Sequence, residues 1–181
     1  ESPFVGCIAL KEITVDEGVT LIPANAFREQ RSIETVILPD SVTKIGNISF
    51  YDATSLKNID FGNGLEEIGT DAFNKCASLT EIDLPDSLLT FGLDAFANCT
   101  GLQGITIPEK ITSIGESAFY NCTSLTSITI PDSVTSIGDY AFYYCEDLTS
   151  ITIPDSVTSM GDEAFNYCKS LTSITIPDSV T

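Results

Sequence analysis

The stretch that decides the fold is Leu125–Cys145, which reads LTSITIPDSVTSIGDYAFYYC. The sequence before and after it is closely similar, and the leading position returns every 23 residues without an insertion or deletion. The leading residues are Leu10, Ile33, Leu56, Leu79, Leu102, Leu125, Leu148 and Leu171. A fixed period of this length indicates a repeat solenoid, in which each unit buries its apolar face only against its neighbours.

The start of each unit has the pattern of a half-buried strand. Ile128 and Ile130 alternate with Ser127 and Thr129, and this period of two places the isoleucines on one face of a sheet. A proline follows directly, and a residue without an N–H group ends a strand and begins a turn. We therefore expect one short strand per coil, stacked with its neighbours into a parallel sheet.

The second half of each unit is expected to return along the convex side of the coil in short extended or helical segments, with Val134 and Ile137 pointing inward from an extended piece. Gly138 is predicted to allow a sharp bend. Ile137, Ala141, Phe142 and Cys145 have the spacing of one face of a short helix that points to the core. The corresponding phenylalanines of all units should stack as an aromatic spine. They are Phe4, Phe27, Phe50, Phe73, Phe96, Phe119, Phe142 and Phe165.

All six cysteines also share one column of the repeat. We interpret them as small buried free thiols, because side chains stacked in parallel point the same way and disfavour a disulfide. The column consists of Cys7, Cys76, Cys99, Cys122, Cys145 and Cys168.

The organisation is predicted to be a single solenoid over residues 1–181. It comprises a partial coil over 1–9, full coils that start at 10, 33, 56, 79, 102, 125 and 148, and a partial coil over 171–181. Both partial coils lie inside a repeat, which leads us to expect a longer parent protein. No run of 18 apolar residues occurs in the sequence, so we expect no membrane span within this stretch.

The charge balance argues against two classes of partner. The chain has 26 Asp and Glu against 8 Lys and Arg, for a net charge of −18. Nucleic acids and anionic membranes are therefore poor partners, because phosphate binding needs Lys and Arg. Most units carry an acid directly after the proline position, and we interpret this carboxylate as a turn residue that accepts hydrogen bonds from backbone N–H groups two residues on. Calcium held between successive coils is the alternative interpretation.

The residues needed for common catalytic and metal chemistry are missing. The sequence contains no His and no C-x-x-C pair, which removes zinc-finger spacing and every triad that relies on imidazole. Adjacent acids such as Glu66 and Glu67 are usually solvated surface rather than a catalytic pair. We therefore expect no catalytic residue, no metal and no cofactor.

Two surfaces are candidates for binding a partner. The first is the outward face of the strands, with an acidic centre beside a row of hydroxyl groups. It consists of Asp60, Glu81, Asp83, Thr106, Ser127, Thr129, Ser150 and Thr152. Acids here would favour a basic partner, although Ser and Thr also suit exposed strands without any partner.

The second candidate surface is a tyrosine cluster in the return segment. Tyrosine is a common interface anchor, but such rings can also lie along their own stack with the hydroxyl in water. The cluster consists of Tyr120, Tyr140, Tyr143, Tyr144 and Tyr167.

The recurring I-P, I-G, A-F and C elements of Leu125–Cys145 resemble the BspA-like, or Treponema pallidum-type, leucine-rich repeats. The resemblance covers essentially the whole chain. The first full unit departs most, with Asp16, Pro23 and Gln30 at the Pro, Gly and Cys positions, and Ala53 and Gly62 are further departures. The resemblance implies a curved right-handed coil with its parallel sheet on the concave face, and it contributes no catalytic residues.

The resemblance also implies a location and a role. Proteins of this type stand on bacterial or protist surfaces and are often linked to adhesion. We therefore interpret the chain as an adhesin-like protein-binding module that is extracellular, on a cell surface or secreted. Its partner would be a host extracellular-matrix or microbial surface protein. The alternative is a structural spacer that presents another domain.

Overall fold

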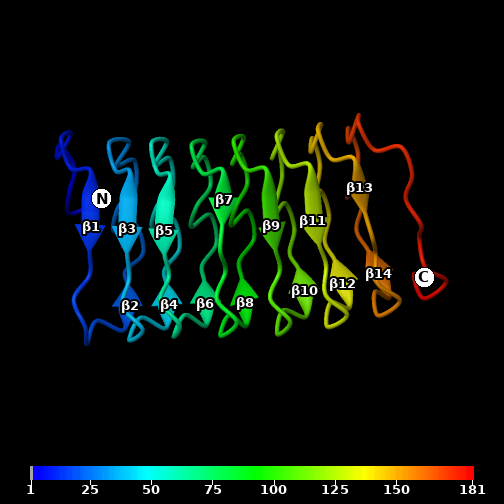
Figure 1. Cartoon of the computed structure of the whole chain (residues 1–181), viewed down its shortest axis with the longest axis horizontal. Coiled ribbons are helices and arrows are strands. Elements are labelled where there is room, and N and C mark those ends of the chain that lie inside the picture. The colour runs from blue at the N-terminus through cyan, green and yellow to red at the C-terminus, as the bar shows by residue number, and fades with distance from the viewer. Residues whose placement is uncertain (1) are drawn as a thin grey trace.

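The computed structural model describes residues 2–181 and shows a parallel β-solenoid whose coils lie side by side along one axis (Figure 1). Each of the seven full coils contributes two short strands. The first strands, which form ladder 1, are β1 (Glu12–Thr14), β3 (Thr35–Ile37), β5 (Asn58–Asp60), β7 (Glu81–Ile82), β9 (Gly104–Thr106), β11 (Ser127–Thr129) and β13 (Ser150–Ile151). The second strands, which form ladder 2, are β2 (Leu21–Ile22), β4 (Lys44–Ile45), β6 (Glu67–Ile68), β8 (Thr90–Phe91), β10 (Ser113–Ile114), β12 (Ser136–Ile137) and β14 (Ser159–Met160). The predicted fold class is confirmed.

Strands within each ladder pair in parallel with a shift of one repeat. Ser127 of β11, for example, lies between Gly104 of β9 and Ser150 of β13. Each first strand has one apolar residue that points inward, which is Val36 in β3 and an isoleucine in the others. In β11, for example, Ile128 is buried between the exposed Ser127 and Thr129. The alternation read from the sequence therefore places the predicted outward face correctly.

Each ladder is interrupted once, which differs from the expected continuous sheet. The order of paired strands in ladder 1 stops at β5 and resumes at β7, and that of ladder 2 stops at β8 and resumes at β10. Both interruptions flank the coil over 79–101. Its strand β7 pairs only with β9, and its strand β8 pairs only with β6. In ladder 1 this coil therefore pairs only with the following coil, and in ladder 2 it pairs only with the preceding coil.

The return segment contains no helix, so the helical stripe predicted over 137–145 is wrong. The described residues contain no helix that could span a membrane either. Each coil instead makes tight turns, and Tyr140 adopts a positive φ of 56° in one of them. The Tyr140 N–H donates to Asp162 C=O at 2.9 Å, and the Phe142 N–H donates to Ala164 C=O at 2.8 Å. A helix would use these N–H groups within the coil, whereas here they bond the next coil.

The predicted aromatic spine is confirmed. Neighbouring rings of the phenylalanine column have centroids 5.1 to 5.7 Å apart and planes within 21° of each other. The rings from Phe50 to Phe142 in this column are fully buried, while Phe4 and Phe165 are half-buried. The spacing slightly exceeds the strand separation of about 4.8 Å, and it allows the offset stacking that aromatic rings prefer.

The cysteine column is also placed as predicted in the middle of the solenoid. Cys76, Cys99, Cys122 and Cys145 are buried and unpaired, while Cys7 is exposed and Cys168 is half-buried. The Sγ atoms of the four buried thiols donate to the carbonyl of the phenylalanine 26 residues earlier at 3.2–3.3 Å. Gln30 occupies the same column, and its Nε2 makes the same contact to Phe4 C=O at 2.7 Å. Each of these five side chains therefore donates one hydrogen bond to a backbone carbonyl of the preceding coil.

The interpretation of the acid after the proline is wrong. In the Pro131 turn, the Val134 N–H donates to Pro131 C=O at 3.1 Å, so the backbone itself closes the turn. Ser133 Oγ donates to Ile111 C=O of the preceding coil at 2.7 Å. The acid between them, Asp132, is exposed. The serine, rather than the acid, ties this turn to its neighbour.

The role assigned to Gly138 is corrected as well. Its φ is not left-handed, so no special bend requires glycine. A Cβ atom added there would lie 2.6 Å from the Glu116 backbone nitrogen of the preceding coil. At Gly115, one repeat earlier, an added Cβ would lie 3.5 Å from Leu93 Cδ2, which is an ordinary contact. The close approach of two coils explains why glycine occupies position 138. At Gly115, which lies beside the break in ladder 2, the two coils approach each other less closely.

We predict that Gly138→Ala destabilises the protein and that Gly115→Ala does not. The first change forces a methyl group against the backbone, which should cost about 1–3 kcal/mol. The second should stay within about 0.5 kcal/mol of the parent. Urea unfolding followed by circular dichroism compares the pair. Equal losses in both variants would show that coil spacing does not differ at these two positions.

We also predict that the buried thiols do not react in the native protein. Burial raises the pKa of the Cys99 thiol to about 12 and raises that of Cys122 well above its usual value. The thiolate is the reactive form, so a colorimetric disulfide reagent at pH 8 should label Cys7 quickly and Cys168 slowly. The other four thiols should react only after unfolding in guanidinium. Rapid labelling of three or more thiols in the native protein would contradict the burial of the column.

Candidate functional site

The outward face of ladder 1 carries all eight residues predicted for the first binding surface. Each of them is exposed. The strand register places them in rows along the solenoid, with Thr129 opposite Thr106 and Ser127 opposite Ser150. The hydroxyl part of the surface is thus continuous from β9 to β13.

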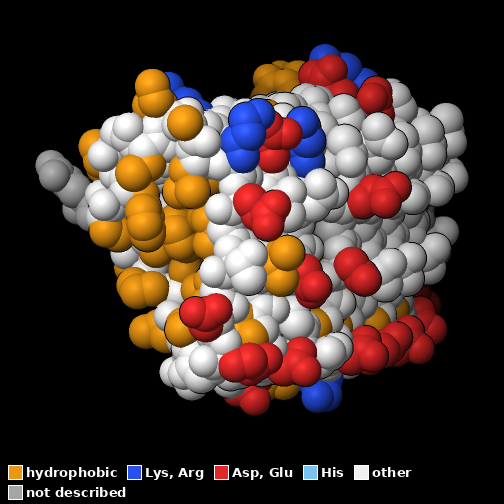
Figure 2. All heavy atoms as spheres, turned by 60° about the vertical axis from the view of Figure 1, so that its left-hand side comes forward, with side chains coloured by type: hydrophobic (Ala, Val, Ile, Leu, Met, Phe, Trp, Pro, Cys, Tyr) orange, Lys and Arg blue, Asp and Glu red, His pale blue; other side chains and the backbone are white. Residues whose placement is uncertain are grey.

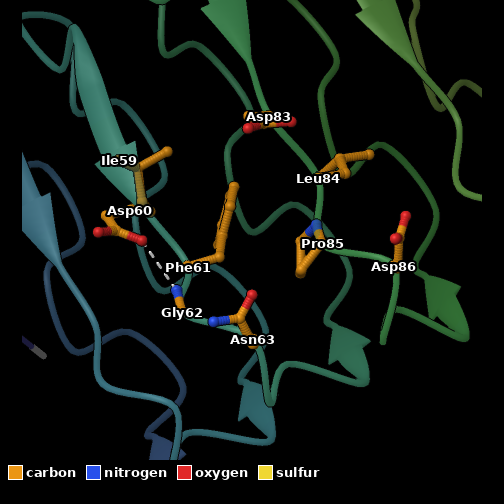
Figure 3. A pocket seen from close by; sticks show the side chains of 9 residues that line it. All are labelled: Ile59, Asp60, Phe61, Gly62, Asn63, Asp83, Leu84, Pro85 and Asp86. Carbon is orange, nitrogen blue, oxygen red and sulfur yellow. Dashed lines mark hydrogen bonds between the residues drawn. The ribbon is translucent and has the colours of Figure 1, made fainter.

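The acidic part of this surface lies at the break in ladder 1. Asp60 ends β5, Glu81 begins β7 and Asp83 follows β7. A groove of about 490 Å³ opens between these two coils, and Figure 3 shows the side chains that line it. We call it the interstrand groove. It is lined by Ile59, Asp60, Phe61, Gly62, Asn63, Asp83, Leu84, Pro85 and Asp86.

The groove opens because the turn over 61–64 is drawn toward the preceding coil. Gly62 has a left-handed φ of 60°, and a Cβ there would lie 2.8 Å from Pro39 carbon. A Cβ on Gly64 would overlap the Asp40 carbonyl oxygen. The Asn63 N–H donates to Asp40 Oδ1 at 2.7 Å and fixes the turn there. Glycine at two positions thus permits a tight contact on one side and leaves space on the other.

The floor of the groove is apolar and its edges are acidic. Phe61 and Leu84 are almost fully buried, at 2% and 7% exposure, and the Phe61 ring packs edge-on against Phe73 at 5.8 Å. In the view of Figure 3, Phe61 stands between Asp60 and Pro85. The Gly62 N–H donates to Asp60 Oδ1 at 3.0 Å and holds that carboxylate. No Lys or Arg is among the lining residues.

The charges of the chain are distributed unevenly. Six of the eight Lys and Arg lie at or before residue 75, and five of those six form ion pairs, as Lys57 does with Glu34 at 2.9 Å. Hydrogen bonds from Lys11 and Lys57 lower the pKa of Glu34 to about 2. Figure 2 shows a row of acids along the lower edge of the molecule, with further acids spread over the middle and top of this face. Burial and the neighbouring Asp71 and Glu116 raise the pKa of Asp94.

The tyrosines of the second candidate surface pack mainly on one another. Tyr120 and Tyr143 stack with centroids 5.4 Å apart, and Tyr144 and Tyr167 stack at 4.5 Å. Tyr140 meets Tyr143 edge-on at 5.6 Å. Only Tyr167 of the five is classed as exposed, at 47%. This packing agrees with the interpretation that the rings lie along their own stack.

The described residues contain no group of three or more His, Cys, Asp or Glu side chains placed to hold a metal ion. The alternative of calcium held between successive coils gains no support from this arrangement of the described residues. The chain also lacks the imidazole that many catalytic centres use.

Sequence reasoning found the acids of the groove but missed the groove itself. Asp86 and Asn63 occupy the repeat position after the proline, which was expected to serve the turn, and no prediction was made for Phe61. The available signal was Gly62, which replaces the recurrent proline and stands two positions before another glycine. Two glycines in one turn indicate close backbone approach, although they do not say which side opens.

Comparison with known proteins identifies the repeat. A family model described as BspA type leucine rich repeat region, in 6 copies, matches residues 1–103 and 90–181. The comparison with curated proteins found no match.

Solved structures share the same architecture. A leucine rich repeat protein of T. pallidum is 33% identical, with a TM-score of 0.87 over 91% of this chain and 79% of that one. A leucine rich cell surface protein of Faecalibacterium prausnitzii is 37% identical, with a TM-score of 0.82 over 91% of this chain and 47% of that one. A leucine-rich repeat protein of Bacteroides ovatus is 30% identical, with a TM-score of 0.89 over 94% of this chain and 46% of that one. The chain thus spans about half the length of the last two proteins.

Proposed function

Because the chain belongs to the family of BspA-type leucine-rich repeats, we propose that it is a non-enzymatic, adhesin-like protein-binding module. We infer an extracellular location, on a cell surface or in secreted material. The name of the similar F. prausnitzii protein, a leucine rich cell surface protein, supports that inference. The partner would be a host extracellular-matrix protein or a microbial surface protein.

The observation that carries the proposal is the change of chemistry along the outward face of ladder 1. Ser and Thr repeat in register from β9 to β13, whereas acids replace them beside the interstrand groove at Asp60, Glu81 and Asp83. These acids are exposed, and the folded core does not require them. A basic surface on the partner would complement them, and repeated coils would add weak contacts through multivalency.

A structural spacer is the second candidate function. The observation that favours it is the uniformity of the later coils, in which Ser127 and Ser150 occupy the same register position. Tyrosines that pack mainly on one another are also consistent with a surface that needs no partner. A spacer would tolerate substitution over its whole exterior, while a binding module concentrates the effects on one patch.

We predict that replacing Asp60, Glu81 and Asp83 together by Ser weakens binding to a basic partner about tenfold. Candidate partners would come from a panel of extracellular-matrix and microbial surface proteins, with affinity measured by biolayer interferometry. Binding by the parent should weaken as salt rises, because exposed charges are screened. Melting temperature should change little, because the three side chains are exposed.

The matched control removes three exposed acids elsewhere, by changing Asp132, Asp155 and Asp178 to Ser. It alters the net charge equally and should bind like the parent. Unchanged affinity in the first variant, together with loss on replacing Tyr143 and Tyr144, would move the site to the tyrosine cluster. Absence of binding by every protein tested would favour the spacer.

A further inference from the structure

The interstrand groove lies between β5 and β7, two neighbouring strands that do not pair with each other. Each pair of neighbouring first strands on either side of it, β3 with β5 and β7 with β9, is hydrogen-bonded in parallel. Within the described chain, β5 and β7 are not joined in this way. Ile59 of β5 is half-buried, whereas the equivalent Val36 and Ile105 are buried. The break therefore exposes apolar surface beside carboxylates.

The return segment keeps the two coils together behind the groove. The Phe73 N–H donates to Ala95 C=O at 2.8 Å, and the Lys75 N–H donates to Ala97 C=O at 2.9 Å. Ladder 2 is also intact here, since β6 pairs with β8. The groove is thus a fixed feature bounded by bonded segments rather than a place where the solenoid comes apart.

The carboxylates around the groove have little to neutralise them. Neither Asp83 nor Asp86 forms a side-chain hydrogen bond or ion pair with any residue in the described part of the chain. Asp60 contacts only its own turn, through the Gly62 N–H. Uncompensated negative charge next to a concave surface attracts a cation.

The shape of the site favours an organic cation over a metal ion. The acids are too dispersed to form a group that could hold a metal in the described chain, and the space of about 490 Å³ greatly exceeds a bare ion. Asp83 and Asp86 lie on different parts of the lining in Figure 3, with Leu84 between them in this view. A planar guanidinium carries five N–H donors and reaches several acceptors at once, which the compact ammonium group of lysine does less well.

We propose that the interstrand groove binds the side chain of an arginine exposed on a partner protein. The aliphatic stem packs on Leu84 and Pro85, and the guanidinium pairs with Asp83 and Asp86, while Asp60 adds negative charge at the far edge. The inference rests on the proposed protein-binding function and names the group that this surface recognises. It also gives the break in ladder 1 a role.

The test is an NMR titration of the isotope-labelled chain with the blocked tripeptide acetyl-Gly-Arg-Gly-amide. The control peptide carries citrulline, which has nearly the same shape as arginine and no charge. Saturable shifts of the amide signals of residues 59–63, 83, 84 and 86 are expected with the arginine peptide only. Equal shifts with both peptides, or shifts spread equally over the acids of the later coils, would overturn the proposal. A lysine peptide that binds as tightly would contradict the choice of arginine.

Variants separate the groove from general acidity. Asp83→Asn with Asp86→Asn should weaken arginine-peptide binding at least fivefold, while Asp132→Asn with Asp155→Asn should leave it within twofold. Both pairs remove two exposed acids, and matching melting temperatures would show that folding is retained. If the Asp83 and Asp86 variant still binds a protein partner with parental affinity, the groove proposal fails and the protein-binding function stands.

Discussion

The stacking of one coil on the next is the constraint on which the rest of this structure depends. Each coil has too few apolar side chains to fold alone, because ordering 23 backbone residues costs more than one coil's burial returns. Stacking resolves this by burying the phenylalanine column between neighbours and by sending backbone N–H groups from coil to coil. The same requirement keeps the repeat free of insertions, because a change of length would shift every register contact beyond it.

The candidate site lies where neighbouring coils stack without the strand pairing that joins the other coils. Around the coil over 79–101, ladder 1 is open on one side and ladder 2 on the other, while the bonds of the return segment continue. Gly62 and Gly64 draw one turn toward the preceding coil. On the other ladder, Phe91 stands where neighbouring coils carry Ile, and its ring packs edge-on against Phe119 at 6.0 Å. A larger ring between two coils gives a physical reason for the wider spacing there.

The sequence allowed much of the fold to be predicted because the repeat constrains it at every unit. Alternation around Ile128 identified the strand and its outward face, and the aligned rings identified the spine. The helix predicted for the return segment was wrong because the apolar residues over 137–145 have a helical spacing. In the structure the backbone of this segment makes hydrogen bonds to neighbouring coils. Spacing within one unit cannot distinguish N–H groups bonded inside a coil from those bonded to the next one. The groove was not predicted for a related reason: it depends on which neighbour Gly62 approaches.

The most direct test of this account is amide hydrogen exchange at the residues directly before the first strands, resolved residue by residue by NMR. The Gln103 N–H donates to Thr80 C=O at 2.9 Å, and the Thr126 N–H donates to Gln103 C=O at 2.9 Å. The equivalent Thr80 N–H faces the break and has no backbone partner among the described residues. The account predicts that the Thr80 amide exchanges at least about tenfold faster than those of Gln103 and Thr126, because exchange follows local opening. Equal protection at all three amides would contradict it, since ladder 1 would then be continuous and the groove closed.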